Sequence, residues 1–394
     1  MRALTWQGID DVRVETVPDP VIEEPTDAIV RMTTTGLCGS DLHLYEVLGP
    51  FMTEGDILGH EPMGIVEEVG SGVTNLRPGD RVVVPFQIAC GDCFMCGHGL
   101  PTQCETTQVR EHGMGAALYG YTKLYGQVPG AQAEYLRVPR ADANPITVPD
   151  GPPDDRFVYL SDVLPTAWQA VEYAAVPDGG TVAVLGVGPI GDMASRIAAH
   201  RGHRVIAVDP QQDRLDRVKV FGAETVCVGE VDGDGVGEVI RDLTDGRGAD
   251  SVIDAVGMEA HGSPVARAAQ KVVGKLPDAV AAPMTRAVGV DRLAAFSTAI
   301  DGVRRGGTIS VVGVYGGAAD PVPMLTMFDK QLQLRMGQAN VRRWVDDIMP
   351  LLTDDDPLGV DTFATHRLPL EMAPHAYADF QQKKEGVCKV VFQP

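Results

Sequence analysis

The sequence predicts an α/β protein in which a doubly wound parallel sheet follows a β-rich domain. With 394 residues, the chain is too long for one ordinary hydrophobic core, so two domains are expected. Its first part contains short β-rich runs such as "DAIVRM" and "DRVVVP" between Gly, Pro and Asp turn signals. Further on, apolar strands such as "TVAVLG" and "RVIAVD" alternate with helical stretches, which is typical of a parallel sheet.

The change in pattern also indicates where the domains begin and end. We expect the first domain at residues 1–163 and the second at 164–336. Residues 337–394 contain a predicted helix, "VRRWVDDIMPLL", and later a predicted strand, "GVCKVVFQP". We expect this closing segment to return to the first domain.

One interval of the second domain is too long for a minimal α/β crossover. It separates "DAVG", which ends at Gly257, from "VRRGG", which ends at Gly307. We therefore expect an extended segment at about 258–303. Within this interval, "DRLAAFSTAIDGVRRGG" has helical periodicity and predicts a helix that ends at Gly306.

Composition excludes two classes of partner. A formal net charge of −21 repels phosphate backbones and anionic lipid, so neither nucleic acid nor a membrane is expected. The chain lacks both an apolar stretch of about 18 residues and a basic flank with an apolar run at its start. We therefore expect a cytoplasmic protein. In that reducing compartment, seven cysteines favour metal binding or catalysis over disulfides.

A glycine-rich turn predicts a dinucleotide site in the second domain. The stretch "TVAVLGVGPIG" places three glycines directly after an apolar strand and at the start of a helix. The first glycine permits a tight turn, the second lets the backbone approach a pyrophosphate, and the third lets the helix pack closely on the strand. A purely structural turn is the alternative. The expected cofactor residues of this turn are Gly186, Val187, Gly188, Pro189, Ile190 and Gly191.

An acidic residue at the end of the next strand indicates which dinucleotide is bound. Asp209 can accept hydrogen bonds from both ribose hydroxyls of NAD, and it would repel the 2′-phosphate of NADP. We therefore expect NAD as the cofactor. Arg214 lies close enough to Asp209 to soften this preference, so NADP remains the less favoured alternative.

Four of the cysteines lie within the run "CGDCFMCGHGLPTQC" at residues 90–104. The spacing C-x2-C-x2-C-x7-C lets four thiolates converge from one loop on a tetrahedral ion. Zinc suits soft sulfur ligands, and a closed site with four cysteines is structural. Unrelated loop cysteines and a redox C-x-x-C pair are the alternatives. The expected structural zinc ligands are Cys90, Cys93, Cys96 and Cys104.

Two upstream motifs, "GLCGSDLHLYE" and "GHEPMG", contain a second group of polar and ligating side chains. Cys38 and His60 could both bind zinc. Taken alone they are equivocal, because a buried free cysteine or a hydrogen-bonded histidine is more common than a metal ligand. The group as a whole comprises Cys38, Ser40, Asp41, His43, His60 and Glu61.

Together these motifs resemble the zinc-dependent medium-chain dehydrogenase/reductase family, the alcohol dehydrogenases in the broad sense. The resemblance covers nearly the whole chain, including "GLCGSDLH", "GHEPMGIVEEVGSGV", "GDRVVVP" and the four-cysteine lobe. It implies a discontinuous GroES-like catalytic domain that flanks a Rossmann domain. It also implies one catalytic and one structural zinc, NAD, a small alcohol or aldehyde as substrate, and a homo-oligomer, either a dimer or a tetramer.

The same resemblance implies a catalytic zinc held by Cys38, His60 and a third ligand just before the Rossmann domain. There liver-type alcohol dehydrogenases usually have Cys and polyol dehydrogenases often Glu, whereas this chain has Asp162 in "YLSDVLPTAWQAV". "LSD-x-LPT" is similar to the glutathione-independent formaldehyde dehydrogenases and formaldehyde dismutases. One thiolate and one carboxylate keep the zinc site formally neutral. An N-cap or turn role for Asp162 is the alternative, and Glu61 is a possible further ligand.

The resemblance assigns the remaining upstream residues to supporting roles. Ser40 and His43 would relay the proton released from the alcohol, while Asp41 would orient the ring of His60 and Glu61 could approach the ion. We expect hydride transfer between NAD and an alcohol or aldehyde hydrate, with formaldehyde as a candidate. The alternatives are a polyol or amino-alcohol dehydrogenase, similar to sorbitol or threonine dehydrogenase, and a non-catalytic nucleotide-binding protein with structural zinc only. The segment at 258–303 would cover NAD or serve oligomer contacts.

Overall fold

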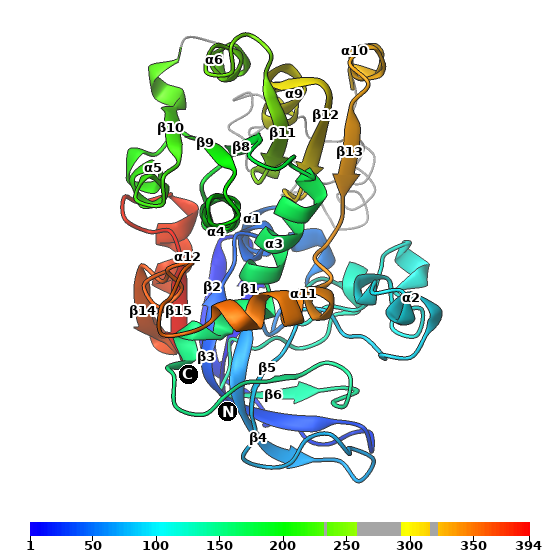
Figure 1. The fold of residues 1–394 in the computed structure, drawn as a ribbon. Coiled ribbons are helices and arrows are strands. Elements are labelled where there is room, and N and C mark those ends of the chain that lie inside the picture. Colours follow the sequence, from blue (N-terminus) through cyan, green and yellow to red (C-terminus); the bar gives the residue numbers. More distant parts are fainter. Residues whose placement is uncertain (232–234, 258–292, 316–321) are drawn as a thin grey trace. The chain divides into compact units, whose positions relative to one another are not determined.

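The computed structural model describes residues 1–231, 235–257, 293–315 and 322–394. The chain forms two compact units (Figure 1). The first combines Met1–Pro165 with Ala339–Pro394, and the second is Thr166–Gln338.

The first unit is built on a seven-stranded sheet and a separate hairpin. The sheet has the order β14-β15-β3-β4-β5-β7, and β6 also pairs with β3. Neighbouring strands are antiparallel except for β14 and β15, which are parallel. The strands of this unit are β1 (Arg2–Gly8), β2 (Asp11–Thr16), β3 (Ala28–Leu37), β4 (Pro62–Val69), β5 (Arg81–Val83), β6 (Tyr135–Val138), β7 (Ile146–Thr147), β14 (His366–Pro369) and β15 (Val390–Gln393).

Short helices connect these strands. The α-helices of this unit are α1 (Asp41–Glu46), α2 (Phe94–Gly97), α11 (Val341–Ile348) and α12 (Ala373–Gln381). The 3-10 helices are η1 (Gly49–Phe51), η2 (Pro101–Gln103), η3 (Arg110–His112), η4 (Lys123–Tyr125), η5 (Asp154–Arg156), η6 (Val158–Ser161), η9 (Met349–Leu351) and η10 (Leu370–Met372). Helix α3 (Val163–Ala174) contains the boundary between the two units.

The C-terminal segment completes the first unit. Its last strand, β15, pairs antiparallel with β3, so that Val390 lies opposite Leu37. The buried guanidinium of Arg156 also pairs with two carboxylates of this segment, at 2.7 Å from Asp354 and 2.6 Å from Asp361. Strand pairing and ion pairs therefore join the C-terminal segment to the N-terminal segment of the same unit.

The second unit contains a six-stranded parallel sheet with the order β10-β9-β8-β11-β12-β13. The order reverses at β8, as in a doubly wound fold. Helix α4 packs with α5, and α6 packs with α9. The strands are β8 (Thr181–Leu185), β9 (Arg204–Asp209), β10 (Glu224–Cys227), β11 (Ala249–Asp254), β12 (Val303–Val311) and β13 (Gln333–Met336). The helices are α4 (Pro189–His200), α5 (Gln212–Lys219), η7 (Val228–Glu230), α6 (Val236–Asp242), α9 (Ala294–Gly302) and α10 (Met324–Asp329).

The predicted fold class is confirmed, because the chain contains both a parallel doubly wound sheet and a β-rich unit. The predicted end of one helix is wrong. Helix α9 ends at Gly302 rather than Gly306, and β12 begins at Val303. The buried Val303 has an extended backbone and pairs with Ala249 of β11, so strand pairing outweighs the glycine stop signal. Most of the predicted extended segment, residues 258–292, lies outside the described residues.

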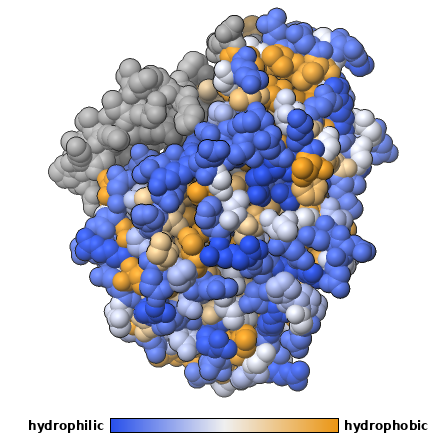
Figure 2. All heavy atoms as spheres, turned by 90° about the vertical axis from the view of Figure 1, so that its left-hand side faces the viewer, coloured by the Kyte–Doolittle hydropathy of each residue, from blue (hydrophilic) through white to orange (hydrophobic). Residues whose placement is uncertain are grey.

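Charged side chains are numerous in the chain, and one face of the molecule is largely hydrophilic (Figure 2). The chain has 54 acidic and 33 basic residues. Figure 2 shows hydrophilic side chains over most of the face that it presents, with small apolar patches between them. In the part of the chain that the structure describes, no helix combines the length and apolar character needed to cross a membrane.

Candidate functional site

An antiparallel strand pair brings the two upstream motifs together. Strand β3 ends directly before Cys38, and β4 begins directly after His60 and Glu61. Because Thr35 of β3 lies opposite Pro62 of β4, the end of one strand lies beside the start of the other. The pairing therefore places a thiol next to an imidazole and a carboxylate.

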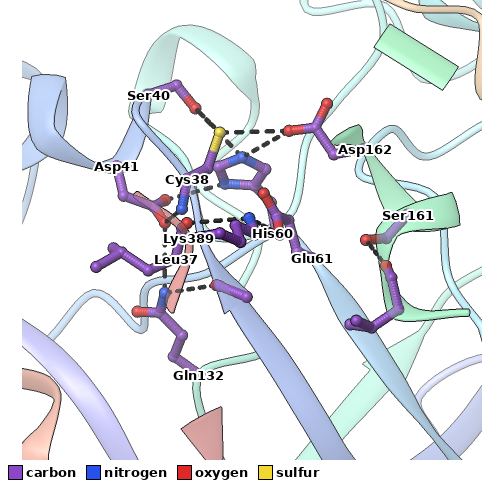
Figure 3. Close-up of polar contacts among 12 residues, drawn as sticks. Leu37, Cys38, Ser40, Asp41, His60, Glu61, Gln132, Ser161, Asp162 and Lys389 are labelled. Carbon is purple, nitrogen blue, oxygen red and sulfur yellow. Dashed lines mark hydrogen bonds and ion pairs between the residues drawn. The ribbon is translucent and has the colours of Figure 1, made fainter. Parts of the chain in front are cut away.

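Asp162 joins this cluster from a distant part of the chain. It follows η6 directly and precedes α3. Its Oδ2 lies 3.4 Å from Cys38 Sγ and 3.5 Å from His60 Nε2. Figure 3 shows these side chains pointing toward one another. Glu61 also offers a ligand atom, and the four ligand atoms lie within 4.8 Å of one another. All four residues are buried.

The spacing of these atoms fits a zinc ion. Zn–S bonds are about 2.3 Å and Zn–N and Zn–O bonds about 2.0–2.2 Å, so tetrahedral ligand atoms lie about 3.3–3.6 Å apart. The separations of 3.4 and 3.5 Å at Asp162 agree with this geometry. Burial and Asp162 raise the pKa of the Cys38 thiol to about 11, and a bound cation would favour its thiolate. One thiolate, one imidazole and one carboxylate would leave a fourth position open.

Asp41 supports both Cys38 and His60. Its Oδ1 lies 3.0 Å from His60 Nδ1, and its Oδ2 accepts a hydrogen bond of 3.0 Å from the Cys38 backbone. Although burial opposes the charged ring, Asp41 and Asp162 raise the pKa of His60 well above its usual value. A proton on Nδ1 facing Asp41 would leave Nε2 as the metal-binding nitrogen.

The two residues predicted to relay a proton both lie at the start of α1. Ser40 directly precedes this helix, and its Oγ lies 3.4 Å from Cys38 Sγ and 3.2 Å from His60 Nε2. The structure therefore brings the Ser40 hydroxyl to the candidate zinc ligands. His43 is buried on α1, with 5% of its surface exposed. Its backbone N–H donates to the Ser40 carbonyl.

The four-cysteine lobe forms the second candidate metal centre. Two Sγ–Sγ separations are 4.0 Å, between Cys90 and Cys96, and 3.9 Å, between Cys93 and Cys104. Zn–S bonds of about 2.3 Å in a tetrahedron give about 3.8 Å. Burial opposes the Cys104 thiolate, but hydrogen bonds from Thr107 and backbone N–H groups outweigh it and lower the pKa of this thiol to about 6. The lobe therefore fits a closed, structural zinc site.

The glycine-rich turn in the second unit fits a dinucleotide. Gly186 has a φ of +81°, which a side chain would strain. A Cβ at Gly191 would lie 1.8 Å from the Gly186 carbonyl, so only glycine permits this approach of α4 to β8. At Gly188, by contrast, a Cβ would meet nothing closer than Arg214, at 3.9 Å. The backbone at Gly188 is thus open to a phosphate at the start of α4.

The predicted ribose-binding carboxylate lies beside this turn. Asp209 Oδ2 accepts a 2.7 Å hydrogen bond from the backbone N–H of Val187, and Oδ1 accepts one of 2.8 Å from Gln211. Each carboxylate oxygen has two lone pairs, so each can also accept a hydrogen bond from a ribose hydroxyl. Pro189 occupies the first turn of α4, next to Ile190. The guanidinium of Arg214 approaches Gly188 from α5.

The sequence motifs did not indicate three buried residues that support the candidate zinc ligands. Gln132 Nε2 donates to Asp41 Oδ2 at 3.3 Å, and Tyr377 donates to Gln132 Oε1 at 2.8 Å. Lys389 pairs with Glu61. Only Lys389 had a signal in the sequence, because a lysine interrupts the apolar run "VCKVVF".

Comparison with known families agrees with this geometry. Residues 24–150 match the alcohol dehydrogenase GroES-like domain, and residues 189–276 match the zinc-binding dehydrogenase family. The zinc-type alcohol dehydrogenase-like protein AdhB of Bacillus subtilis is 40% identical over 399 residues, covering 100% of both chains. The glutathione-independent formaldehyde dehydrogenase of Pseudomonas aeruginosa is 30% identical and covers 96% of this chain and 94% of that protein.

A solved structure shows the same architecture. Alcohol dehydrogenase TADH from Thermus sp. ATN1 matches with a TM-score of 0.81 and 33% identity, and the match covers 100% of this chain and 99% of that one. NAD binding is typical of such proteins. The chain therefore belongs to the zinc-dependent medium-chain dehydrogenase/reductase family, and it is an alcohol dehydrogenase-like oxidoreductase that acts on CH–OH groups.

Proposed function

We propose that this oxidoreductase oxidises formaldehyde, in its hydrated form, with NAD. One observation carries the proposal: an aspartate, Asp162, completes the donor set with Cys38 and His60. The relative from Pseudomonas aeruginosa, named as a glutathione-independent formaldehyde dehydrogenase, supports the same substrate. Formaldehyde hydrate is a geminal diol, so it carries the C–H and O–H groups that an alcohol dehydrogenase needs.

The reaction balances without a further reactant. Formaldehyde hydrate and NAD⁺ give formic acid, NADH and a proton, because the carbon loses a hydride and one hydroxyl loses its proton. Zinc bound by Cys38, His60 and Asp162 would supply a Lewis acid for the substrate oxygen, and NAD would accept the hydride.

Ser40 is the residue that we propose to relay the hydroxyl proton, its Oγ accepting that proton as it gives up its own. Its Oγ lies 3.2 Å from His60 Nε2 and 3.4 Å from Cys38 Sγ, so the hydroxyl stands beside two proposed ligands. His43, three residues further along in α1, would pass the proton on. Asp41 would hold the His60 ring in place throughout.

The first experiment supplies formaldehyde to the purified zinc enzyme and measures NADH, formate and methanol. With added NAD, we expect one formate per NADH. Without added NAD, an enzyme that retains its cofactor would produce formate and methanol in equal amounts. Ser40→Ala should lower the rate about 10²–10⁴-fold with zinc content unchanged. Oxidation of a polyol or an amino alcohol, with no turnover of formaldehyde under either condition, would overturn the proposal.

We also propose that the protein forms a homo-oligomer. In the described part of the chain, β13 is the last strand of the parallel sheet, and its backbone could pair with a second copy. Large exposed side chains lie on β13 and on the preceding helix α10, where Leu325 and Phe328 are 80% and 81% exposed. Sedimentation should show a dimer or tetramer, and Phe328→Glu should shift it toward monomer. A monomeric unmodified protein would contradict the proposal.

A further inference from the structure

Three strands of the parallel sheet end at the same edge. Asp254, the last residue of β11, lies opposite Leu185 of β8 and Val311 of β12. Because these strands are parallel, the chain leaves all three at this edge, in the order β8, β11 and β12 (Figure 1). The glycine-rich turn follows β8, so the segments after β11 and β12 begin beside the expected phosphate site.

The order of the strands decides which half of a dinucleotide these segments face. Asp209 ends β9, on one side of β8, and would bind the adenosine ribose. The open backbone at Gly188, after β8, would bind the pyrophosphate. A dinucleotide held at both places continues past β8 to its other side, over the ends of β11 and β12. The nicotinamide half therefore belongs beside the segments that follow these two strands.

Asp254 accepts hydrogen bonds from both segments. Its Oδ1 accepts from the backbone N–H groups of Val256, at 3.0 Å, and Gly257, at 3.2 Å. Its backbone carbonyl accepts from the N–H groups of Val312, at 3.0 Å, and Gly313, at 2.9 Å. The residue is fully buried, so water does not compete for its oxygens. Asp254 therefore joins the segment after β11 to the segment after β12.

The other carboxylate oxygen of Asp254 is bonded to Tyr315. The Tyr315 hydroxyl donates to Asp254 Oδ2 at 2.5 Å. Burial and the nearby Asp254 raise the pKa of Tyr315, so the phenol keeps its proton and remains the donor. The ring makes a T-shaped contact with Phe296 of α9, with 6.3 Å between the ring centroids. The hydroxyl of Tyr315 therefore fixes the segment after β12 at a second point.

Close backbone contacts connect these segments to the glycine-rich turn. A Cβ at Gly313 would lie 2.2 Å from the backbone nitrogen of Gly257, so only glycine permits the two segments to approach so closely. A Cβ at Gly186 would lie 2.6 Å from the Val256 side chain. The turn after β8 therefore contacts the segment after β11, which in turn contacts the segment after β12.

We propose that Tyr315 is a positioning residue for the dinucleotide. Through its bond to Asp254, the Tyr315 hydroxyl holds residues 312–315 in the place where they border the nicotinamide half. Backbone groups that are fixed before binding cost less to order when the dinucleotide binds, so the hydroxyl strengthens the binding of that half. This role depends on the dinucleotide site alone and requires neither formaldehyde as the substrate nor the assigned zinc ligands.

The test compares NADH with ADP as ligands of the zinc enzyme after any bound nucleotide has been removed. ADP carries the adenosine ribose and two phosphates but lacks the nicotinamide half. Tyr315→Phe removes only the hydroxyl, and it should raise the Kd of NADH, measured from NADH fluorescence, about tenfold. The Kd of ADP, measured by calorimetry, should change by less than about twofold, because ADP does not extend over β11 and β12.

Two variants serve as controls. Asp254→Asn keeps an acceptor for the backbone N–H groups, and its amide can donate to the Tyr315 oxygen. It should therefore bind NADH nearly as the unmodified protein does. Tyr173→Phe removes a hydroxyl from a half-buried tyrosine of the same unit and should change neither affinity.

Unchanged NADH affinity in Tyr315→Phe would overturn the inference. An equal loss of affinity for NADH and ADP would also overturn it, since general damage to the site affects both ligands. A loss in Asp254→Asn as large as that in Tyr315→Phe would assign the effect to the charge of Asp254 instead of the hydroxyl. Failure of Tyr315→Phe to fold would show that the hydroxyl serves the fold rather than the dinucleotide.

Discussion

Replacing Asp162 with asparagine is expected to remove the catalytic zinc and nearly all activity. Asn keeps the shape of the side chain but loses the negative charge that faces Cys38 Sγ at 3.4 Å and His60 Nε2 at 3.5 Å. A Lewis acid contributes several kcal/mol to such a reaction, and each 1.36 kcal/mol is tenfold in rate, so kcat/KM should fall by about 10³-fold or more. Elemental analysis should find one zinc per chain instead of two.

Two matched variants distinguish the loss of a metal ligand from a general effect on folding. Asp162→Cys supplies another anionic ligand and should retain two zinc ions per chain. Asp150→Asn removes an aspartate from an exposed loop of the same unit and should change neither zinc content nor rate. The ligand assignment fails if Asp162→Asn retains both zinc ions and the activity of the unmodified protein.

The candidate site was predictable from sequence where its residues lie in short motifs. Cys38, Ser40 and Asp41 lie within four positions of one another, and His60 and Glu61 directly precede β4, so the pairing of β3 with β4 brings them together. The glycine-rich turn and the cysteine run are local in the same way. Such motifs have a fixed geometry because neighbouring residues leave the backbone little choice.

The supporting residues could not be found in this way, because their contacts depend on distant parts of the chain. Lys389 reaches Glu61 only because β15 pairs with β3, and Tyr377 reaches Gln132 across 245 positions of sequence. No local pattern specifies such a pairing. The end of α9 was predicted at the wrong residue for a similar reason. The glycine stop signal at Gly306 is local, whereas the pairing of β12 with the distant β11 places Val303 in a strand.

Loss of the cysteine lobe's zinc is the other change for which we expect a large effect, this time on stability. Cys104 is fully buried, and its Sγ accepts a 3.3 Å hydrogen bond from the Cys90 backbone. The apolar residues around the lobe are few, mainly Ala89 and Ala116. A lobe with so small a core depends on its metal, because metal binding supplies folding free energy.

Cys104→Ser should therefore remove the structural zinc and lower the melting temperature. Loss of a metal site is among the changes that cost about 4 kcal/mol or more, and each kcal/mol shifts the Tm of a unit this large by about 2–4 °C. We expect a decrease of about 10 °C by calorimetry, with zinc falling from two to one per chain.

A second cysteine provides the control for this experiment. Cys227 is half-buried, lies outside both ligand clusters, and has its Sγ 3.8 Å from the Pro210 carbonyl. Cys227→Ser should keep both zinc ions and the original Tm. In Cys104→Ser the remaining metal should still respond to imidazole after exchange with Co²⁺, because the catalytic cluster keeps Cys38, His60 and Asp162. Two retained zinc ions and an unchanged Tm in Cys104→Ser would show that the lobe holds no structural metal.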